Sequence, residues 1–463
     1  MRLENDGVVG QGVGRWGASD SLSILSIIKL WPNVLAPQRG SQTEHRLRAL
    51  QDLGGARIRV IAPIAGAKDG VKRWRRQVFA QGSVDSAVPD LEKRASIVVH
   101  HPRYTDYTRG AGADGGWIER ELTRRSYRAA VLRAAQRLIR RYGPFDLIDA
   151  HGLAFDGWAA RSAAMRSGCP LVVTAYDAAD RLRGLSGAAR TRAARTIVDA
   201  RLLLAQGRMQ AQALTQLGAA ESRIAVIRPG VDLFRFKPEP EAAARARLKR
   251  SLGVAETAPL ALSIADGEQG DAHHRLAIAA IAESPRITLR ILGAGQAVET
   301  LSAYAARRGV AERIGFLDDP TDIRAPEIMR AADVALVLAD GPGGRAVALE
   351  CLASGAGVVV SPLIETEGVG ESPAVEVAPI SAFDGKPDLA GSLLAKRIAA
   401  LTPTDAQAAA ALRASARRVA EGSPLRHSVE DLAAAFRRAA HKGEPHRGGG
   451  APAALEAAAA PER

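Results

Sequence analysis

The sequence predicts an α/β protein of two Rossmann-like domains that face one cleft. The chain has 463 residues, of which 47% are hydrophobic, and this length allows two or three domains with substantial cores. Predicted strands and helices alternate along two halves of similar size, as parallel sheets with crossover helices require. In the second half, residues 337–362 (VLADGPGGRAVALECLASGAGVVVSP) have the pattern of strand, Gly-rich turn, helix, turn and strand.

Residues 1–20 are predicted to be a flexible leader. Gly12, Gly14 and Gly17 have the G-x-G-x-x-G spacing of a dinucleotide site. That fingerprint follows a strand and opens a helix, whereas these glycines precede the first predicted strand. They therefore predict no cofactor.

The first domain is predicted over residues 21–217 and the second over 218–425. Strands of the first domain are predicted in SILSIIKLW, ARIRVIAP, SIVVHHPRY, FDLIDAHG and PLVVTAYDAAD, with helices between them. Strands of the second are predicted in RIAVIRPGVD, PLALSIAD, TLRILGAG and RIGFLDD, followed by the 337–362 unit. Residues 426–440 form one more predicted helix. The tail, 441–463, has no periodic apolar residues and is expected to be disordered.

The net charge of +13 permits nucleic acid, anionic lipid or polyphosphate ligands. Basic residues cluster at 72–76 and along a predicted helix at 119–141, where a solvated surface is the alternative interpretation. No zinc-finger, RNA-recognition or basic-zipper pattern accompanies them, so no specific nucleic acid is predicted. No apolar run approaches the roughly 20 residues of a spanning helix, and Cys169 and Cys351 suggest no disulfide framework. The expected location is cytoplasmic, with peripheral contact to the inner face of the membrane as a further prediction.

Several segments, in their order and spacing, resemble the family-4 retaining glycosyltransferases of the GT-B fold, particularly the bacterial exopolysaccharide and teichuronic-acid type. The segments are APQRGSQTEHRLRAL, HHPRY, FDLIDAHGLAFDGWAA, PLVVTAYDAAD, VIRPGVDLFRFKP, ILGAGQ with the following helix and GFLDD, and ALECLASGAGVVVSP. The resemblance covers roughly residues 22–440. It implies an acceptor-side first domain, a second domain that holds the nucleotide sugar, and a helix at 426–440 that returns to the first domain.

The resemblance also implies which residues border the donor. They are Gly40, Ser41, Asp232, Gly293, Arg345 and Glu350. Glu350 would accept hydrogen bonds from the ribose hydroxyls, and the glycines would let the backbone approach an anion. Acceptor-side candidates are Tyr176, Asp177 and Asp180. The residues alone leave structural alternatives open: a plain turn at Gly40 or Asp232, a helix cap at Asp177, and solvent contact for Arg345. No metal or separate cofactor is expected, and no catalytic residue is assigned.

Among the departures from the family pattern, three replace the residues that would most directly meet the donor diphosphate and sugar. The family places an Arg and a Lys at a helix start, where Gly270 and Asp271 stand here, and a Glu where Pro342 stands. An acid in place of a base repels a diphosphate, and His273 and His274 would carry charge only below their pKa.

The predicted function is transfer of a sugar, as by a hexosyltransferase, from a nucleotide sugar to a glycan or lipid-linked acceptor in surface polysaccharide synthesis. The three departures predict weakened turnover. An inactive relative that binds a glycan, a nucleotide or a partner protein is the alternative, and a basic scaffold for nucleic acid ranks third.

Overall fold

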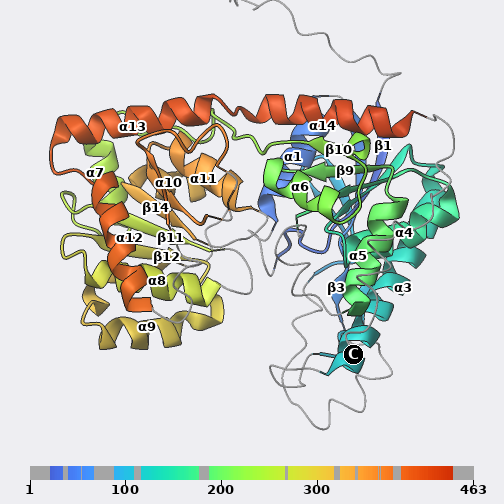
Figure 1. The fold of residues 1–463 in the computed structure, drawn as a ribbon, viewed down its shortest axis with the longest axis horizontal. Helices are drawn as coiled ribbons and strands as arrows, with labels where there is room; N and C mark the ends of the chain where they lie inside the picture. Colours follow the sequence, from blue (N-terminus) through green and yellow to red (C-terminus); the bar gives the residue numbers. More distant parts are fainter. Residues whose placement is uncertain are drawn as a thin grey trace, which may run out of the picture.

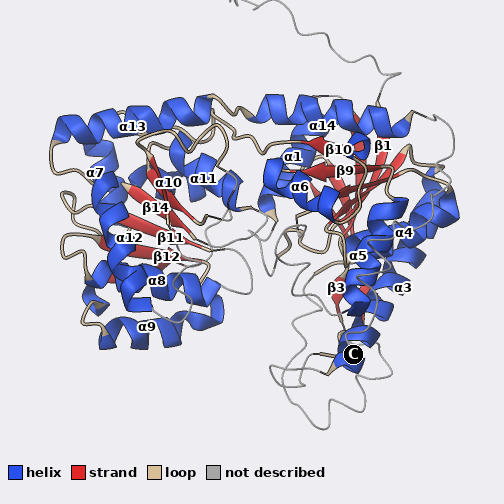
Figure 2. Ribbon diagram, viewed as in Figure 1, coloured by secondary structure: helices blue, strands red, loops and turns tan. Residues whose placement is uncertain are grey.

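The computed structural model describes residues 21–34, 40–53, 55–66, 88–108, 116–176, 187–265, 270–317, 324–338, 343–362, 364, 366–378 and 387–441. The chain forms two α/β halves, each built on its own sheet (Figures 1 and 2). The first sheet has eight strands in the order β10-β9-β8-β7-β1-β2-β5-β4, and the second has six in the order β13-β12-β11-β14-β15-β16. The predicted fold class of two Rossmann-like domains is confirmed. The leader and all but the first residue of the tail lie outside the described residues.

In the first half the strands are β1 (Leu22–Ile27), β2 (Ala56–Ile61), β3 (Ile64–Ala65), β4 (Leu91–Arg94), β5 (Ile97–His100), β6 (Arg103–Tyr104), β7 (Leu147–His151), β8 (Leu171–Thr174), β9 (Leu202–Ala205) and β10 (Ile224–Val226). Its helices are α1 (Ser41–Asp52), α3 (Trp117–Tyr142), α4 (Asp156–Ser167), α5 (Gly187–Asp199) and α6 (Arg208–Gln216). All neighbours in the large sheet are parallel except the β4–β5 pair, and β3 pairs with β6 separately.

In the second half the strands are β11 (Leu260–Ile264), β12 (Thr288–Leu292), β13 (Ile314–Leu317), β14 (Val334–Val337), β15 (Gly357–Val360) and β16 (Val375–Val377). The helices are α7 (Ala242–Ser251), α8 (Gly270–Ala282), α9 (Val298–Arg307), α10 (Ala325–Ala331), α11 (Gly344–Ala353), α12 (Pro387–Leu401), α13 (Ala406–Glu421) and α14 (Leu425–Ala440). This sheet is parallel throughout. Among the described residues, no helix has both the length and the apolar character needed to cross a membrane.

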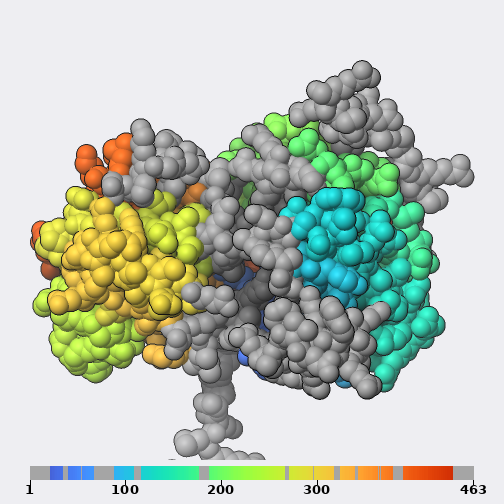
Figure 3. Space-filling view, turned by 90° about the horizontal axis from the view of Figure 1, so that it is seen from below, coloured from blue at the N-terminus to red at the C-terminus, as the bar shows by residue number. Residues whose placement is uncertain are grey.

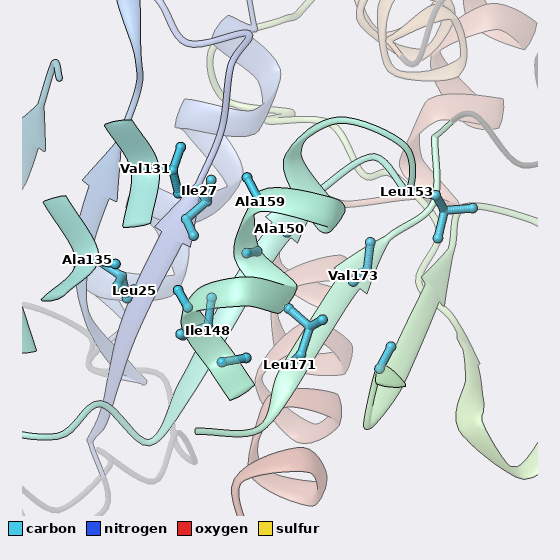
Figure 4. Close-up of a cluster of buried hydrophobic side chains, with 14 of the residues drawn as sticks. Leu25, Ile27, Val131, Ala135, Ile148, Ala150, Leu153, Ala159, Leu171 and Val173 are labelled. Carbon is cyan, nitrogen blue, oxygen red and sulfur yellow. The ribbon is translucent and has the colours of Figure 1, made fainter. Parts of the chain in front are cut away.

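The central strands are apolar because helices cover both faces of each sheet. Residues of β1 alternate between two cores: Ile24 packs with α14 on one face, and Leu25 packs with α3 and α4 on the other. Figure 4 shows this second core, with Leu25 and Ile27 of β1 near Val131 and Ala135 of α3. Burial on both faces fixes the strands, so their carboxyl ends form a rigid edge from which site residues can project.

The chain passes between the halves twice, and the two passes are paired. Val231 N donates to Ser423 O (2.9 Å), and Leu425 N donates to Val231 O (2.8 Å). A Cβ on Gly230 would lie 2.7 Å from Pro424 O, so this close approach needs glycine. After the second pass α14 packs against α1, whereas α13 packs against α11 (Figure 1).

The predicted start of the second domain at residue 218 is wrong by one strand. β10 pairs in parallel with β9, so the first sheet continues to Val226. The strand is short, and its sequence carries no feature that assigns it to one sheet rather than the other. The passage between the halves therefore follows Val226.

Candidate functional site

A pocket of about 340 Å³ lies between the two halves, with lining residues from both. Figure 3, seen from the side opposite α13 and α14, shows the first half (cyan to green) and the second half (yellow to orange) on opposite sides of the molecule. From the first half the lining includes Gly40, Gln42, Thr43, His45, Arg46, Arg48, His151, Asp156, Tyr176 and Gln206. From the second half and the passages it includes Pro229, Gly230, Asp232, Arg235, Phe236, Gly343, Ala346, Glu350 and Leu425.

Helix α1 starts at the pocket because of Gly40. This residue has φ +76, and a Cβ there would lie 2.0 Å from Leu30 O, so only glycine fits. Gly40, Gln42 and Thr43 all line the pocket, and Ser41 between them does not. The unpaired N–H groups of the helix's first turn consequently lie at the edge of the cavity, a favourable place for an anion.

Helix α11 approaches the same pocket from the second half. Glu350, half-buried, lines the cavity together with Gly343 and Ala346. The first turns of α1 and α11 meet, since a Cβ added to Gly343 would lie 2.4 Å from Gln42 Oε1. An acidic side chain from one half and a helix N-terminus from the other therefore border one cavity.

A second contact crosses the cleft at Arg235. Its guanidinium donates to His45 Nε2 at 2.9 Å, and both residues line the pocket. Asp232 shapes the turn that carries Arg235, because its Oδ1 accepts from the backbone N–H groups of Phe234 (3.0 Å) and Arg235 (3.1 Å). Asp232 thus lines the cavity and also makes the turn that the sequence allowed as an alternative.

At the pocket wall, a chain of hydrogen bonds joins five side chains near the carboxyl edge of the first sheet. Asp149 Oδ2 lies 3.0 Å from His151 Nε2, and His151 Nδ1 lies 3.2 Å from the Tyr176 hydroxyl. Arg46 of α1 donates to the same hydroxyl at 3.2 Å. Asp149 also accepts from the Ser26 hydroxyl at 3.1 Å. The network fixes Tyr176 and Arg46 toward the cavity that both line.

The charges in this network shift its pKa values. Burial alone would lower the pKa of His151, but the attraction of Asp149 outweighs it, and the pKa is raised. Burial alone would raise the pKa of Tyr176, but Arg46 and His151 outweigh it, and the pKa is lowered. The Asp149 carboxylate thus favours the charged form of the His151 imidazole, and the nearby cations favour the ionised form of the Tyr176 phenol.

Asp156 is a buried carboxyl group that also lines the pocket. It accepts hydrogen bonds from the Tyr127 hydroxyl (2.6 Å) and from Lys29 N (2.9 Å). Burial nevertheless raises its pKa to about 6, because these donors only partly offset the desolvation of the charge. Asp156 therefore changes its protonation state close to neutral pH.

Three predicted donor residues, Ser41, Gly293 and Arg345, lie outside the pocket lining. Arg345 is buried, and its guanidinium donates to the backbone oxygen of Glu367 at 3.0 Å. The Glu367 carboxylate joins the halves, since it pairs with Arg208 of α6 and with Arg228 of the first passage. Position 293 requires glycine for two reasons: its φ is +84, and a Cβ there would lie 2.6 Å from Ala265 O. Asp177, Asp180 and Pro342 lie outside the described residues.

The start of α8 holds the acidic departure noted in the sequence. Asp271 lies in the first turn of this helix. His274 is fully buried against the Ser263 hydroxyl (2.8 Å), and burial lowers its pKa to about 4. The imidazole is neutral at physiological pH and cannot replace a cation. Within the described part of the chain, no group of three or more His, Cys, Asp or Glu residues could hold a metal ion.

Sequence reasoning assigned no role to five lining residues: His45, Arg46, Arg235, His151 and Asp156. All five lie within segments that carried the family resemblance. What the sequence lacked was the pairing of each with a residue distant in the chain.

Comparison with known proteins places the chain in a family. The model of Glycosyltransferase Family 4 matches residues 92–235. A D-inositol 3-phosphate glycosyltransferase of Actinosynnema mirum is 30% identical over 338 residues, which cover 67% of this chain and 76% of that protein. The corresponding protein of Rhodococcus jostii is 29% identical over 332 residues, with 67% and 70% covered. The chain therefore belongs to glycosyltransferase family 4, as the sequence predicted.

Solved structures share the fold at low identity. The Anabaena Alr3699/HepE structure in complex with UDP and glucose has a TM-score of 0.61 and 20% identity, covering 90% of this chain and 100% of that one. Sucrose-phosphate synthase from Thermosynechococcus elongatus has a TM-score of 0.68 and 14% identity, with 90% and 98% covered. The fold is thus the GT-B arrangement of two Rossmann-like domains.

Proposed function

We propose that this protein transfers a sugar from a nucleotide sugar, bound in the pocket between its halves, to a glycan or lipid-linked acceptor in surface polysaccharide synthesis. One observation carries the proposal. The carboxylate of Glu350 and the N-terminus of α1 border the same cavity of about 340 Å³. A nucleotide sugar has a ribose diol and a diphosphate. The carboxylate suits the diol, and the helix N-terminus suits the diphosphate.

On the donor side, Glu350 would accept hydrogen bonds from both ribose hydroxyls, because a carboxylate has two acceptor oxygens. The N-terminus of α1, at Gln42, would receive the diphosphate, whereas Thr43 N already donates to Gly40 O at 3.0 Å. The HepE neighbour was solved with UDP and glucose, which supports a nucleotide-sugar donor for this chain as well. As the family resemblance implies, the proposed reaction uses no metal.

The positive charge for the leaving diphosphate would come from other residues than the Arg and Lys of the family pattern. Gly270 and Asp271 supply none, whereas Arg46 and Arg235 both line the pocket. Arg46 is only 7% exposed, and its Nε has no hydrogen-bond partner among the described atoms. A buried guanidinium with spare donors suits a phosphate oxygen. Turnover is proposed to be weakened rather than lost.

The acceptor is proposed to carry a phosphate and to bind near Tyr176. The relatives are named for D-inositol 3-phosphate, and a lipid-linked acceptor also carries phosphate. Arg46 and Arg48 place two cations on this side of the cavity. The finer prediction of an exopolysaccharide or teichuronic-acid enzyme remains part of this proposal.

We further propose a cytoplasmic protein with peripheral contact to an anionic membrane through the start of α3. Trp117 is 72% exposed and Ile118 51% exposed, and exposed Arg120 and Arg125 lie beside them. Aromatic and basic residues together favour the interface of an anionic bilayer. The second predicted cluster, 72–76, lies outside the described residues.

The test of the donor site is a calorimetric titration with a panel of nucleotide sugars. We expect one of them to bind the wild type and to bind Glu350→Gln at least tenfold more weakly. Glu299→Gln, an exposed carboxylate on α9, is the matched control and should leave affinity within twofold. Binding without any transfer to phosphate-bearing acceptors would favour the inactive binding module, and no binding by any nucleotide sugar would refute the donor site.

A further inference from the structure

The first half contains a second cavity, of about 420 Å³, between the C-terminal part of α3 and the segments around β4, β5 and β6. Its polar lining consists mainly of His100, Arg103, Arg133, Arg137, Arg141 and Asp90. We call it the arginine cavity. It shares no lining residue with the pocket between the halves, and α3 lies on the side of the first half away from the second half (Figure 1).

The arginines of α3 form one row. Arg133, Arg137 and Arg141 recur every four residues, so they share a face of the helix at intervals of roughly 6 Å. His100, at the end of β5, and Arg103 of β6 line the cavity as well. The cavity is therefore bordered by cationic groups from more than one element.

Little negative charge balances this row. Among the described residues, Arg133, Arg137 and Arg141 form no ion pair with a carboxylate, whereas Arg125 of the same helix pairs with Glu121 at 3.3 Å. Of the described residues that line the cavity, Asp90 is the one carboxylate, and its side chain is 87% exposed and lies 3.4 Å from Arg103. Arginines at this spacing on a helix repel one another. The ion pairs of the described residues do little to offset that repulsion.

Two nitrogen atoms of lining residues are also unsatisfied. His100 Nε2 and Arg103 Nη1 are buried and have no hydrogen-bond partner among the described atoms. Buried polar groups in folded proteins are nearly always hydrogen-bonded, and an exception calls for a ligand or a bound water. This observation is independent of the arginine row and indicates that the cavity receives an acceptor-rich molecule.

We propose that the arginine cavity binds a soluble oligophosphate, that is, a small molecule with two or more linked phosphate groups. Guanidinium groups bind phosphate oxygens through paired, charge-assisted hydrogen bonds. A row about 12 Å long exceeds the reach of one phosphate and suits a short chain of them. Because the site is separate from the pocket between the halves, its ligand is an effector and is neither donor nor acceptor in the transfer.

Binding there has a predicted pH dependence. The pKa of His100 is lowered by its burial and by the charges of Arg59 on β2, Arg137 and Arg141 on α3, and His101 next to it. A bound phosphate offsets that repulsion and favours the protonated imidazole. Protonation is thus coupled to binding, and affinity rises as the pH falls from 7.5 toward 5.5.

The experiment is calorimetric titration of the full chain with sodium tripolyphosphate in 0.15 M salt. We expect saturable 1:1 binding that weakens at least tenfold in Arg133→Gln/Arg137→Gln. The control Arg128→Gln/Arg140→Gln removes the same charge from the same helix at positions outside the cavity lining and should stay within twofold. In His100→Asn the rise in affinity at low pH should be lost. A saturating nucleotide sugar should not compete.

Three results would overturn the proposal: no saturable binding, equal weakening in both double variants, or displacement of tripolyphosphate by a nucleotide sugar. A vesicle arm distinguishes a soluble ligand from a lipid headgroup. Flotation with phosphatidylglycerol vesicles should be the same for wild type and Arg133→Gln/Arg137→Gln. If flotation is lost in that variant while tripolyphosphate does not bind, a membrane surface is the occupant, and the oligophosphate is excluded.

Discussion

Replacing Asp156 by asparagine should change how the stability of this protein depends on pH. In the folded chain the pKa of Asp156 is about 6, against an ordinary value of 3.8. Because the pKa of Asp156 is higher in the folded state than in the unfolded state, the folded state binds more protons at pH values between the two. The stability that Asp156 contributes therefore falls as the pH rises from about 4 through 6, and the loss is complete above that range. A shift of about two units corresponds to about 3 kcal/mol.

Asp156→Asn removes this titration, and it also lowers the unfolding free energy by an amount that does not depend on pH. Tyr127 and Lys29 N donate to different carboxylate oxygens, and an amide keeps only one of the two acceptors. A buried donor left without an acceptor costs about 1–3 kcal/mol. We expect Asp156→Asn to be less stable than the wild type near pH 4, and to gain about 3 kcal/mol relative to it by pH 7.5.

The assay is urea denaturation of both proteins at half-unit steps from pH 4 to 7.5, reported as the difference in unfolding free energy. The control is Asp431→Asn, which removes a carboxylate at an exposed position on α14. A difference curve for Asp156→Asn that stays flat across the range would refute the reasoning, because it would mean that Asp156 is ionised at little cost.

Three further outcomes are expected. Gly270→Arg/Asp271→Lys should strengthen binding of a nucleoside diphosphate by tenfold or more in calorimetry, because charge-assisted hydrogen bonds contribute about 1.5–3 kcal/mol each; unchanged affinity would mean that the diphosphate lies elsewhere. Asp333→Asn should lower the unfolding free energy, measured by urea denaturation, by about 3 kcal/mol, because Asp333 accepts from Arg245 (2.6 Å) and Lys249 (2.8 Å). A loss below about 1 kcal/mol would contradict this. Trp117→Ser should reduce flotation with anionic vesicles severalfold at low salt, and full flotation would remove α3 from the membrane prediction.

The fold was predictable because buried parallel strands have a distinctive composition. β8 (LVVT), β9 (LLLA), β14 (VALV) and β15 (GVVV) are buried along their whole length, and such runs between helices predict a parallel sheet. What the sequence could not supply was the partner of each strand. β10 has the same local character whichever sheet it joins, and only its pairing with β9 assigns it to the first half.

Site residues were predictable where backbone geometry restricts the residue type. Gly40 has a positive φ and a crowded Cβ position and lines the pocket, so glycine before a helix was an informative signal. Gly293 has the same backbone constraint but lies outside the lining. Side-chain direction was not predictable. Arg345 lies in the expected helix but turns toward the Glu367 loop, and the pKa of Asp156 depends on residues 29 and 127 positions away in sequence.

The distribution of charge links the proposed transfer to closure of the cleft. A diphosphate leaving group is stabilised by cations held in place before the reaction. Here the cations come from opposite halves: Arg46 is fixed by Tyr176 in the first half, and Arg235 extends from the second half to His45. Because neither half has both arginines, separating the halves would disperse the charge around the donor. In an enzyme of this design, contacts across the cleft such as that between Gln42 and Gly343 act on catalysis itself, so weakening them should lower turnover more than donor affinity.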